Sequence, residues 1–239
     1  MSTVVVTGCS SGIGLAICRA LLEQGETNVV GLSRRRPEEL CDYPRFTWLA
    51  LDLADETVLV SQAARLEKWK DDIDAVVLAA GYGRFGALEQ FSWTQMQRLM
   101  TVNFTSQAYL LNVLLPGMKY RGCGRVIFIG SDAALKGTRY GAIYCASKFA
   151  IRGFCQAMRE ECAKAEIPVS LINPGMVDTA FYEQQSFTPG EARVNHLLAT
   201  DVAEYVLRIM ADEPVFSVDE VTLTPMKKVV SGKKGSRLS

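Results

Sequence analysis

The chain has 239 residues, of which 49% are hydrophobic and 22% are charged. Its 26 basic residues balance 26 acidic residues, so the formal net charge is zero. This composition excludes a disordered chain, which needs low hydrophobicity and a large net charge, and it argues against a dedicated nucleic-acid binder, which carries a basic excess.

Several other absences narrow the class of protein. No apolar run approaches the ~18–20 residues that cross a bilayer, and the first residues have neither a basic stretch nor a small-residue cleavage site. We therefore expect a soluble, cytoplasmic protein that binds neither membrane nor nucleic acid. The seven cysteines form no C-x-x-C pair, so reduced thiols and no metal site are expected. The single histidine, His196, is expected to be solvated or hydrogen-bonded rather than catalytic.

Apolar runs of strand length alternate with helical patterns along the chain. The helical spacing i, i+3, i+4, i+7, i+8 occurs over residues 13–21 and 202–210, and Asp201 with Glu204 resembles a capping box. The continuous hydrophobicity of seven runs is typical of strands buried on both faces: 4–7, 29–33, 47–51, 75–79, 126–130, 169–172 and 221–224. This alternation predicts an α/β protein with a single-domain Rossmann fold, in which a doubly wound parallel sheet of about seven strands has helices on both faces.

Two segments interrupt this rhythm. Residues 176–200 lack clean periodicity and contain Pro189-Gly190, which predicts a lid over a site within a domain spanning 1–225. The tail 226–239 is basic, and we expect it to be a solvated, frayed terminus, with a partner-binding arm as the alternative. Its charged residues are Lys227, Lys228, Lys233, Lys234 and Arg237.

The first strand leads into a glycine-rich turn that an amphipathic helix follows at once. Gly8, Gly12 and Gly14 allow a sharp turn and let a pyrophosphate approach the backbone, while the helix N-terminus offers unpaired N–H groups to the anion. Ser10, Ser11 and Ile13 belong to the same turn. The strand–turn–helix context therefore predicts dinucleotide binding.

A tyrosine and a lysine stand four residues apart in a helix-forming stretch. Tyr144 and Lys148 therefore project from one helix face, about 6 Å apart along the axis. A tyrosine ordinarily has a pKa of about 10, and a nearby positive charge lowers the pKa by favouring the phenolate. Ser131 ends an apolar strand thirteen residues before Tyr144, at the edge where parallel α/β sheets bind ligands.

The glycine turn and the order Ser131, Tyr144, Lys148 resemble the classical short-chain dehydrogenase/reductase family, of an NADP-preferring type, over nearly the whole chain. The resemblance implies an oxidoreductase that transfers a hydride between NADP(H) and a carbonyl compound or secondary alcohol. It implies that Tyr144 exchanges a proton with the substrate oxygen, that Lys148 lowers the pKa of Tyr144 and holds the nicotinamide ribose, and that Ser131 polarises the carbonyl. Asn103 matches the fourth catalytic member and would anchor a water that links Lys148 to solvent.

The end of the second strand indicates which nicotinamide cofactor is used. Ser33 takes the place where NAD-dependent members usually have aspartate, and Arg34 matches the basic residue of NADP-dependent members. A guanidinium can grip a 2′-phosphate that a carboxylate would repel. We therefore expect NADP(H) in preference to NAD(H), with Arg34 as the leading contact and Arg35, Ser10 and Ser33 assisting. The alternative is a basic surface turn.

The resemblance also assigns contacts at the other strand ends. Asp52 would meet the adenine edge, and Ala79-Ala80-Gly81 stands in place of the family's NNAG, without its two asparagines. Those amides are expected to stabilise the central sheet in relatives, so local rigidity is in question here. The full implied cofactor-binding set is Gly8, Ser10, Ser11, Gly12, Ile13, Gly14, Ser33, Arg34, Arg35, Asp52, Leu53, Ala80, Gly81, Tyr144, Lys148, Pro174, Gly175, Val177 and Thr179.

The expected substrate pocket is largely apolar and aromatic, which favours a carbonyl compound with a hydrophobic portion. Its candidate residues are Ser131, Ala133, Tyr140, Tyr144 and Phe181. Residues 218–225 look like the closing run of family members that act on small hydroxy acids and aldehydes. The family also implies a homo-oligomer, either a tetramer or a dimer.

Two alternative functions remain open on the same fold. One is a non-enzymatic protein that senses NADP(H) or binds a partner, and the other is a dehydratase or epimerase that forms product without net consumption of the cofactor. The intact Ser131, Tyr144 and Lys148 argue against the sensor, because a sensor has no need of the phenol.

Overall fold

Seven parallel strands form the central sheet of the protein. The computed structural model describes residues 2–211 and 216–233. The strands lie in the order β10-β6-β5-β4-β1-β2-β3, which confirms the predicted fold class. Their bounds are β1 (Ser2–Thr7), β2 (Thr27–Ser33), β3 (Phe46–Ala50), β4 (Ile73–Leu78), β5 (Arg125–Ile129), β6 (Val169–Pro174) and β10 (Glu220–Leu223).

The strand order reverses beside β1, and this reversal positions the site. From β1 the chain steps outward to β2 and β3, and then returns to β4 on the other side of β1. The loops that leave β1 and β4 therefore turn to opposite faces of the sheet. They leave a crevice at the carboxyl ends of these strands, where open α/β sheets bind their ligands.

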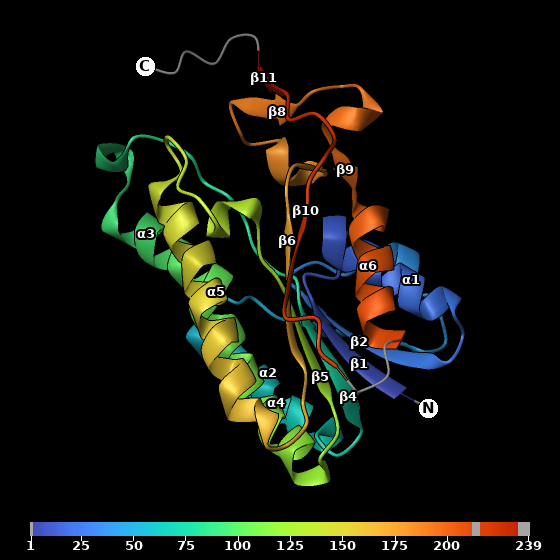
Figure 1. Cartoon of the computed structure of the whole chain (residues 1–239). Helices are drawn as coiled ribbons and strands as arrows, with labels where there is room; N and C mark the ends of the chain where they lie inside the picture. Colours follow the sequence, from blue (N-terminus) through green and yellow to red (C-terminus); the bar gives the residue numbers. More distant parts are fainter. Residues whose placement is uncertain (1, 212–215, 234–239) are drawn as a thin grey trace.

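Helices cover both faces of the sheet (Figure 1). On one face, α1 (Gly12–Glu23) packs against α6 (Ala199–Ala211). The other face carries α2 (Glu56–Leu66), α4 (Ser106–Arg121) and α5 (Ala142–Ala163), with α3 (Trp93–Met100) packed on α5. Six short 3-10 turns connect these elements: Glu38–Leu40, Glu67–Trp69, Leu88–Gln90, Asp132–Ala134, Ala180–Tyr182 and Arg193–Asn195.

The apolar strands form these layers because both of their faces are covered. Val4 and Val6 pack toward α1 and α6, whereas Val5 packs toward the helices of the opposite face, and all three are fully buried. Alternate side chains thus enter two separate cores, so the strands show no polar alternation. This arrangement is the physical basis of the continuous runs in the sequence.

The predicted lid, residues 176–200, lies above the carboxyl ends of the strands. It contains β7 (Val177–Asp178), β8 (Phe187–Pro189) and β9 (Leu197–Leu198), and β7 pairs with β9. His196, in the lid, is buried, and its Nδ1 lies 3.0 Å from the Gly190 oxygen, so the expectation of a hydrogen-bonded histidine is confirmed.

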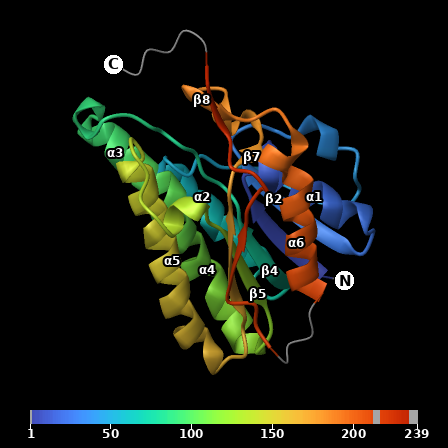
Figure 2. The same cartoon turned by 45° about the horizontal axis from the view of Figure 1, so that its top comes forward.

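The end of the described chain differs from the expected frayed terminus. Residues 226–233, here called the strap, run back over the lid, where β11 (Val230–Gly232) pairs antiparallel with β8. Figure 2 shows the red segment that contains the strap beside β8 near the top of the molecule. Backbone bonds hold this segment, with Gly190 N donating to Val229 O at 3.0 Å and Lys233 N to Ser186 O at 2.9 Å. Lys234 and Arg237 lie outside the described residues.

The start of α6 also differs from its prediction. The helix begins at Ala199, two residues before the predicted cap, and Asp201 lies in its first turn. Asp201 Oδ2 accepts from Leu198 N at 2.8 Å, so the carboxylate reaches back to the cap position as the acidic member of a capping box does. Among the helices of the described ranges, none combines the length and apolarity needed to cross a membrane.

Candidate active site

The glycine turn has the backbone that an anion site needs. Gly8 and Gly12 have φ values of 78° and 56°, in the left-handed region that favours glycine. A Cβ on Gly14 would lie 2.4 Å from the Gly8 oxygen, so no side chain fits there. Ser11 is the N-cap of α1 but makes no side-chain capping bond, which leaves the first N–H groups of the helix available to a phosphate.

A single cavity of about 1210 Å³ extends from this turn to the predicted catalytic residues Ser131, Tyr144 and Lys148. Every residue of the predicted cofactor-binding and substrate-binding sets lines it. The glycines keep its floor open at the turn, and its size and length fit a dinucleotide with room for a substrate. Of the predicted catalytic residues, only Asn103 lies outside the cavity wall.

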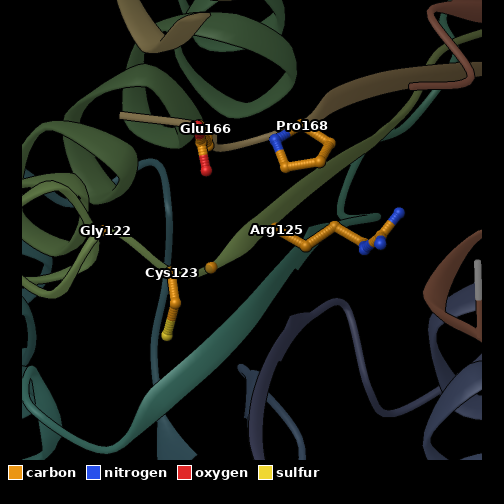
Figure 3. Close-up of a pocket in the computed structure, with 6 residues that line it drawn as sticks. Gly122, Cys123, Arg125, Glu166 and Pro168 are labelled. Atoms are coloured by element: carbon orange, nitrogen blue, oxygen red, sulfur yellow. The ribbon is translucent and has the colours of Figure 1, made fainter. Parts of the chain in front are cut away.

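A second, smaller hollow lies at the opposite edge of the sheet (Figure 3). It has a volume of about 220 Å³ beside the start of β5 and the loop before β6. The close-up shows the side chains of Cys123 and Arg125 pointing in different directions rather than toward one centre. Parallel sheets bind ligands at their carboxyl edge, so we assign no site here. In the described ranges, no three potential ligands among His, Cys, Asp and Glu cluster to hold a metal ion.

At the end of β2, two arginines face the cavity. Arg34 and Arg35 are exposed and line it, whereas Arg36 lies outside it, with its Nε 3.0 Å from Cys41 Sγ. Ser33 also lines the cavity, but its hydroxyl donates to Arg35 O at 2.7 Å and accepts from Trp48 Nε1 at 3.1 Å. Ser33 therefore shapes the turn that presents the two arginines.

The predicted adenine contact has a partner that the sequence did not reveal. Asp52 Oδ1 accepts from Ala54 N at 2.9 Å, so this residue also stabilises the turn after β3. Its other carboxylate oxygen lies 3.6 Å from Arg98 Nη2, and Arg98 lines the cavity from α3. No motif marks Arg98, because only the packing of α3 brings it to this wall.

The three central catalytic candidates meet at the far end of the cavity. Tyr144 and Lys148 are buried on one face of α5, with Lys148 Nζ 5.9 Å from the centre of the Tyr144 ring. Lys148 Nζ donates to Ile129 O at 3.2 Å. The Ser131 hydroxyl acts on the Tyr144 phenol and lowers its pKa. The structure therefore brings the phenol, the hydroxyl and the ammonium together at this end of the cavity.

Burial has the largest effect on the acid–base properties of this group. It raises the pKa of the Tyr144 phenol to about 12, although the hydrogen bond from Ser131 acts in the opposite direction. Burial also lowers the pKa of Lys148 to about 8. Desolvation thus outweighs the lowering of the Tyr144 pKa that the sequence led us to expect from Lys148. The ammonium approaches the ring and the Ile129 carbonyl rather than the phenol oxygen.

Asn103 lies in one π-helical turn, Thr101–Thr105, between α3 and α4, here called the π-turn. Its Oδ1 accepts from Tyr82 N, and its Nδ2 donates to Tyr82 O and to Ser147 Oγ, each at 3.0 Å. Both amide hydrogens are thereby used to join the loop after β4 to the catalytic helix. A Cβ on Gly81 would lie 3.3 Å from Asn103 Oδ1 and 3.5 Å from Lys148 Nζ, so glycine permits this close arrangement. The water-anchoring role of Asn103 remains a prediction.

Gln107 is a structural residue of the site that sequence reasoning missed. It is fully buried in α4, and its Nε2 donates to Ala80 O at 2.6 Å and to Asn103 O at 3.0 Å. Thr7 Oγ1 accepts from Ala80 N at 3.0 Å on the other side of this loop. These contacts supply the rigidity that was in question once the family's two asparagines were missing. The only signal was a long polar side chain on an apolar helix face.

Aromatic rings surround the Tyr144 side chain. Phe85 and Phe181 lie 5.2 Å and 5.9 Å from its ring centre, and Phe187 of the lid lies 5.0 Å from Phe85. Tyr182 contacts both Phe181 and Phe187. These rings therefore line the cavity beside the phenol.

The comparisons with known proteins agree with this fold. The family model for short chain dehydrogenase matches residues 2–189. The 17-beta-hydroxysteroid dehydrogenase type 1 of Mus musculus is 32% identical over 250 residues, which cover 95% of this chain and 70% of that protein. An uncharacterized oxidoreductase of Staphylococcus epidermidis is 32% identical over 93% of this chain and 96% of its own length.

A solved structure resembles the whole chain. The alcohol dehydrogenase from the archaeon Thermococcus sibiricus, complexed with 5-hydroxy-NADP, has a TM-score of 0.84 at 25% identity, covering 96% of this chain and 99% of that chain. The chain belongs to the short-chain dehydrogenase family, a family of oxidoreductases that work with nicotinamide dinucleotides.

Proposed function

We propose that this protein is an NADP(H)-dependent oxidoreductase that interconverts an apolar secondary alcohol and its carbonyl compound. The observation that carries this proposal is the single cavity that joins Arg34 at one end to Tyr144 and Lys148 at the other. A cofactor held by its phosphates at the glycine turn would extend toward the phenol. When bound, it supplies the hydride donor or acceptor.

Support for NADP(H) comes from the charges at the end of β2. Two exposed arginines face the cavity there, and Ser33 stands where a carboxylate would repel a 2′-phosphate. The archaeal alcohol dehydrogenase of similar fold is described in complex with an NADP derivative.

The protein's own part in the reaction is proton management. In reduction the Tyr144 phenol donates its proton to the substrate oxygen as that oxygen gains charge, and Ser131 donates a hydrogen bond to the same atom. In oxidation the phenolate takes the proton from the alcohol. Because the pKa of Tyr144 is raised to about 12, the phenol is protonated at neutral pH and ready to act as the donor.

The aromatic rings around Tyr144 support an apolar substrate. Phe85, Phe181 and Phe187 offer ring faces and edges rather than charges to the reacting end of the cavity. Such a wall favours an alcohol carried on a flat hydrocarbon skeleton. The mouse relative is named for a hydroxysteroid, which is an alcohol of this type.

The decisive test is Tyr144→Phe. With a panel of apolar ketones and alcohols, the variant should lose at least about 100-fold in kcat, because it lacks the transferable proton. Its affinity for NADPH, measured by fluorescence titration, should stay unchanged. Tyr120→Phe is the matched control, since Tyr120 is 90% exposed on α4 and should leave turnover at the wild-type rate.

Two outcomes would contradict the proposal. Wild-type turnover in Tyr144→Phe would mean that the Tyr144 phenol does not transfer the proton in the reaction. Tight NADPH binding without turnover on any carbonyl substrate would favour the sensing alternative, which the buried group of Ser131, Tyr144 and Lys148 disfavours.

A further inference from the structure

The strap reaches the active site through two lysines. Lys228 Nζ lies 2.7 Å from Asp132 Oδ2 and forms an ion pair with this carboxylate. Lys233 Nζ donates to Tyr182 O at 2.6 Å and to Glu183 O at 2.8 Å, in the lid. Lys228 also lines the cavity together with Asp132. One lysine of the strap therefore binds lid carbonyls, whereas the other binds a carboxylate next to the catalytic serine.

Asp132 continues this contact to the reacting groups. The Ser131 hydroxyl donates to Asp132 Oδ1 at 3.3 Å, and the same hydroxyl acts on the neighbouring Tyr144 phenol, whose pKa it lowers. Lys228, Asp132, Ser131 and Tyr144 thus form a continuous chain from the strap to the acid–base group. Residues 226–233 follow the last strand of the sheet and are distant in sequence from the others.

We propose that Lys228 is a positioning residue of the active site. Its ion pair with Asp132 sets the charge beside Ser131 and Tyr144. This ion pair thereby couples docking of the strap to the acid–base chemistry. This inference rests on the proposed function of Tyr144. It goes beyond that function because it assigns a regulatory role to the C-terminal strap.

The physical basis is a competition for the Asp132 carboxylate. An unpaired carboxylate attracts the Ser131 hydrogen and disfavours negative charge on the phenol. The Lys228 ammonium offsets that charge and weakens the carboxylate as an acceptor. The Ser131 hydrogen then becomes available to the phenolate or to the substrate oxygen.

Few other polar groups near Tyr144 bear on its ionisation. On its own helix these are Cys145 and Lys148, and the Tyr182 phenol lies on the lid side. Asp132 is the carboxylate that acts on Tyr144, and its negative charge raises the pKa of the phenol. The neighbouring Phe85 and Phe181 carry no charge.

The test compares the pH dependence of kcat/KM for alcohol oxidation in the NADP-loaded enzyme. In this profile kcat/KM rises as the active-site base, Tyr144, loses its proton. Lys228→Met should move this limb to higher pH by about half a unit, because the negative charge of Asp132 is no longer offset by an ammonium. Asp132→Asn should move the limb to lower pH, and the double variant should shift less than Lys228→Met alone. The shift in Lys228→Met should shrink at high salt, which screens the charge of Asp132.

Two control variants separate charge from strap docking. Lys233→Met removes the ammonium that binds two lid carbonyls but leaves the β8–β11 pairing and the Lys228–Asp132 ion pair in place, so it should raise the KM for substrate without moving the pH limb. Lys227→Met removes the same charge one residue away, where the backbone N–H donates to Val194 O, and should change neither quantity.

A turnover-independent measurement keeps this test separate from the proposed function. The near-ultraviolet absorbance of ionised tyrosine is titrated in the NADP-loaded form of each variant, with and without Tyr144→Phe, at pH values below about 10, where the lysine ammonium keeps its charge. Less phenolate of Tyr144 at a given pH in Lys228→Met than in wild type supports the inference even if no substrate turns over. Coincident titrations and pH profiles in Lys228→Met and wild type would overturn it, whereas absence of turnover in wild type would overturn the proposed function instead.

Discussion

Arg34 and Arg36 are close in sequence but face different surroundings. Arg34 lines the cavity, whereas Arg36 contacts Cys41 and lies 3.8 Å from Glu38. Arg34→Ala should therefore lower the ratio of kcat/KM for NADPH over NADH by about tenfold or more, since a charge-assisted hydrogen bond to the 2′-phosphate is lost.

The control for this prediction is Arg36→Ala, which removes the same charge outside the cavity and should leave the ratio near the wild-type value. Both ratios come from initial rates with each cofactor. A wild-type enzyme that prefers NADH would contradict the interpretation that Arg34, at the end of β2, binds the 2′-phosphate of NADP(H).

Single residues were predictable where local spacing fixes geometry. Tyr144 and Lys148 share a helix face because they are four residues apart, and Ser131 ends a strand at the edge where ligands bind. Arg98 and Gln107 reach the site through the packing of separate helices, which no local pattern encodes. Tertiary structure likewise decides the pKa of Tyr144, because burial outweighs the neighbouring charge.

At the scale of elements, the Gln107 side chain holds the π-turn to the loop after β4. Gln107 Nε2 satisfies two buried carbonyl groups, Ala80 O and Asn103 O, and also lies 3.4 Å from Val102 O. Gln107→Leu would leave these acceptors without their donor. We expect the free energy of unfolding to fall by about 1–3 kcal/mol, measured by urea denaturation.

Gln97→Leu is the matched control for this prediction. Gln97 lies exposed on α3, so its replacement should change the free energy of unfolding by less than about 0.5 kcal/mol. Equal stabilities of Gln107→Leu and wild type would mean that the π-turn does not depend on this amide.

The elements also divide into those that the sequence predicts and those that it does not. The strands of the central sheet follow from continuous apolar runs, because each run must be buried on two faces. The pairing of β8 with β11 joins two short segments that are distant in sequence and lack hydrophobic periodicity. The basic, Gly/Ser-containing composition of the tail therefore predicted a frayed end rather than a strap.

For the whole molecule, the two buried ionisable groups of the site make stability depend on pH. The pKa of Lys148 is lowered to about 8 in the folded protein, whereas an unfolded lysine has a pKa of about 10.4. Between these values the unfolded state binds more protons, so the contribution of Lys148 to stability rises with pH. Below pH 8 the full cost of burying the ammonium is present. The fold therefore gives up stability at neutral pH to keep this group beside Tyr144.

Removing Lys148 should expose this cost. Lys148→Met should be more stable than wild type at pH 7, by up to about 3 kcal/mol, and this advantage should disappear near pH 10.5. The lost hydrogen bond to Ile129 O lowers stability at both pH values, so the change between them carries the test. Lys164→Met, at the exposed end of α5, is the control and should show no such change.

Other buried groups lower the free energy of unfolding as the pH rises in this range, whereas the contribution of Lys148 increases. Burial raises the pKa of Cys9 to about 11 and that of Tyr144 to about 12. For both groups the folded state binds more protons as the pH rises above the unfolded pKa, so total stability falls at alkaline pH. These contributions cancel when wild type and Lys148→Met are compared at each pH. A stability difference that is the same at pH 7 and at pH 10.5 would mean that Lys148 is not held in the fold at a lowered pKa.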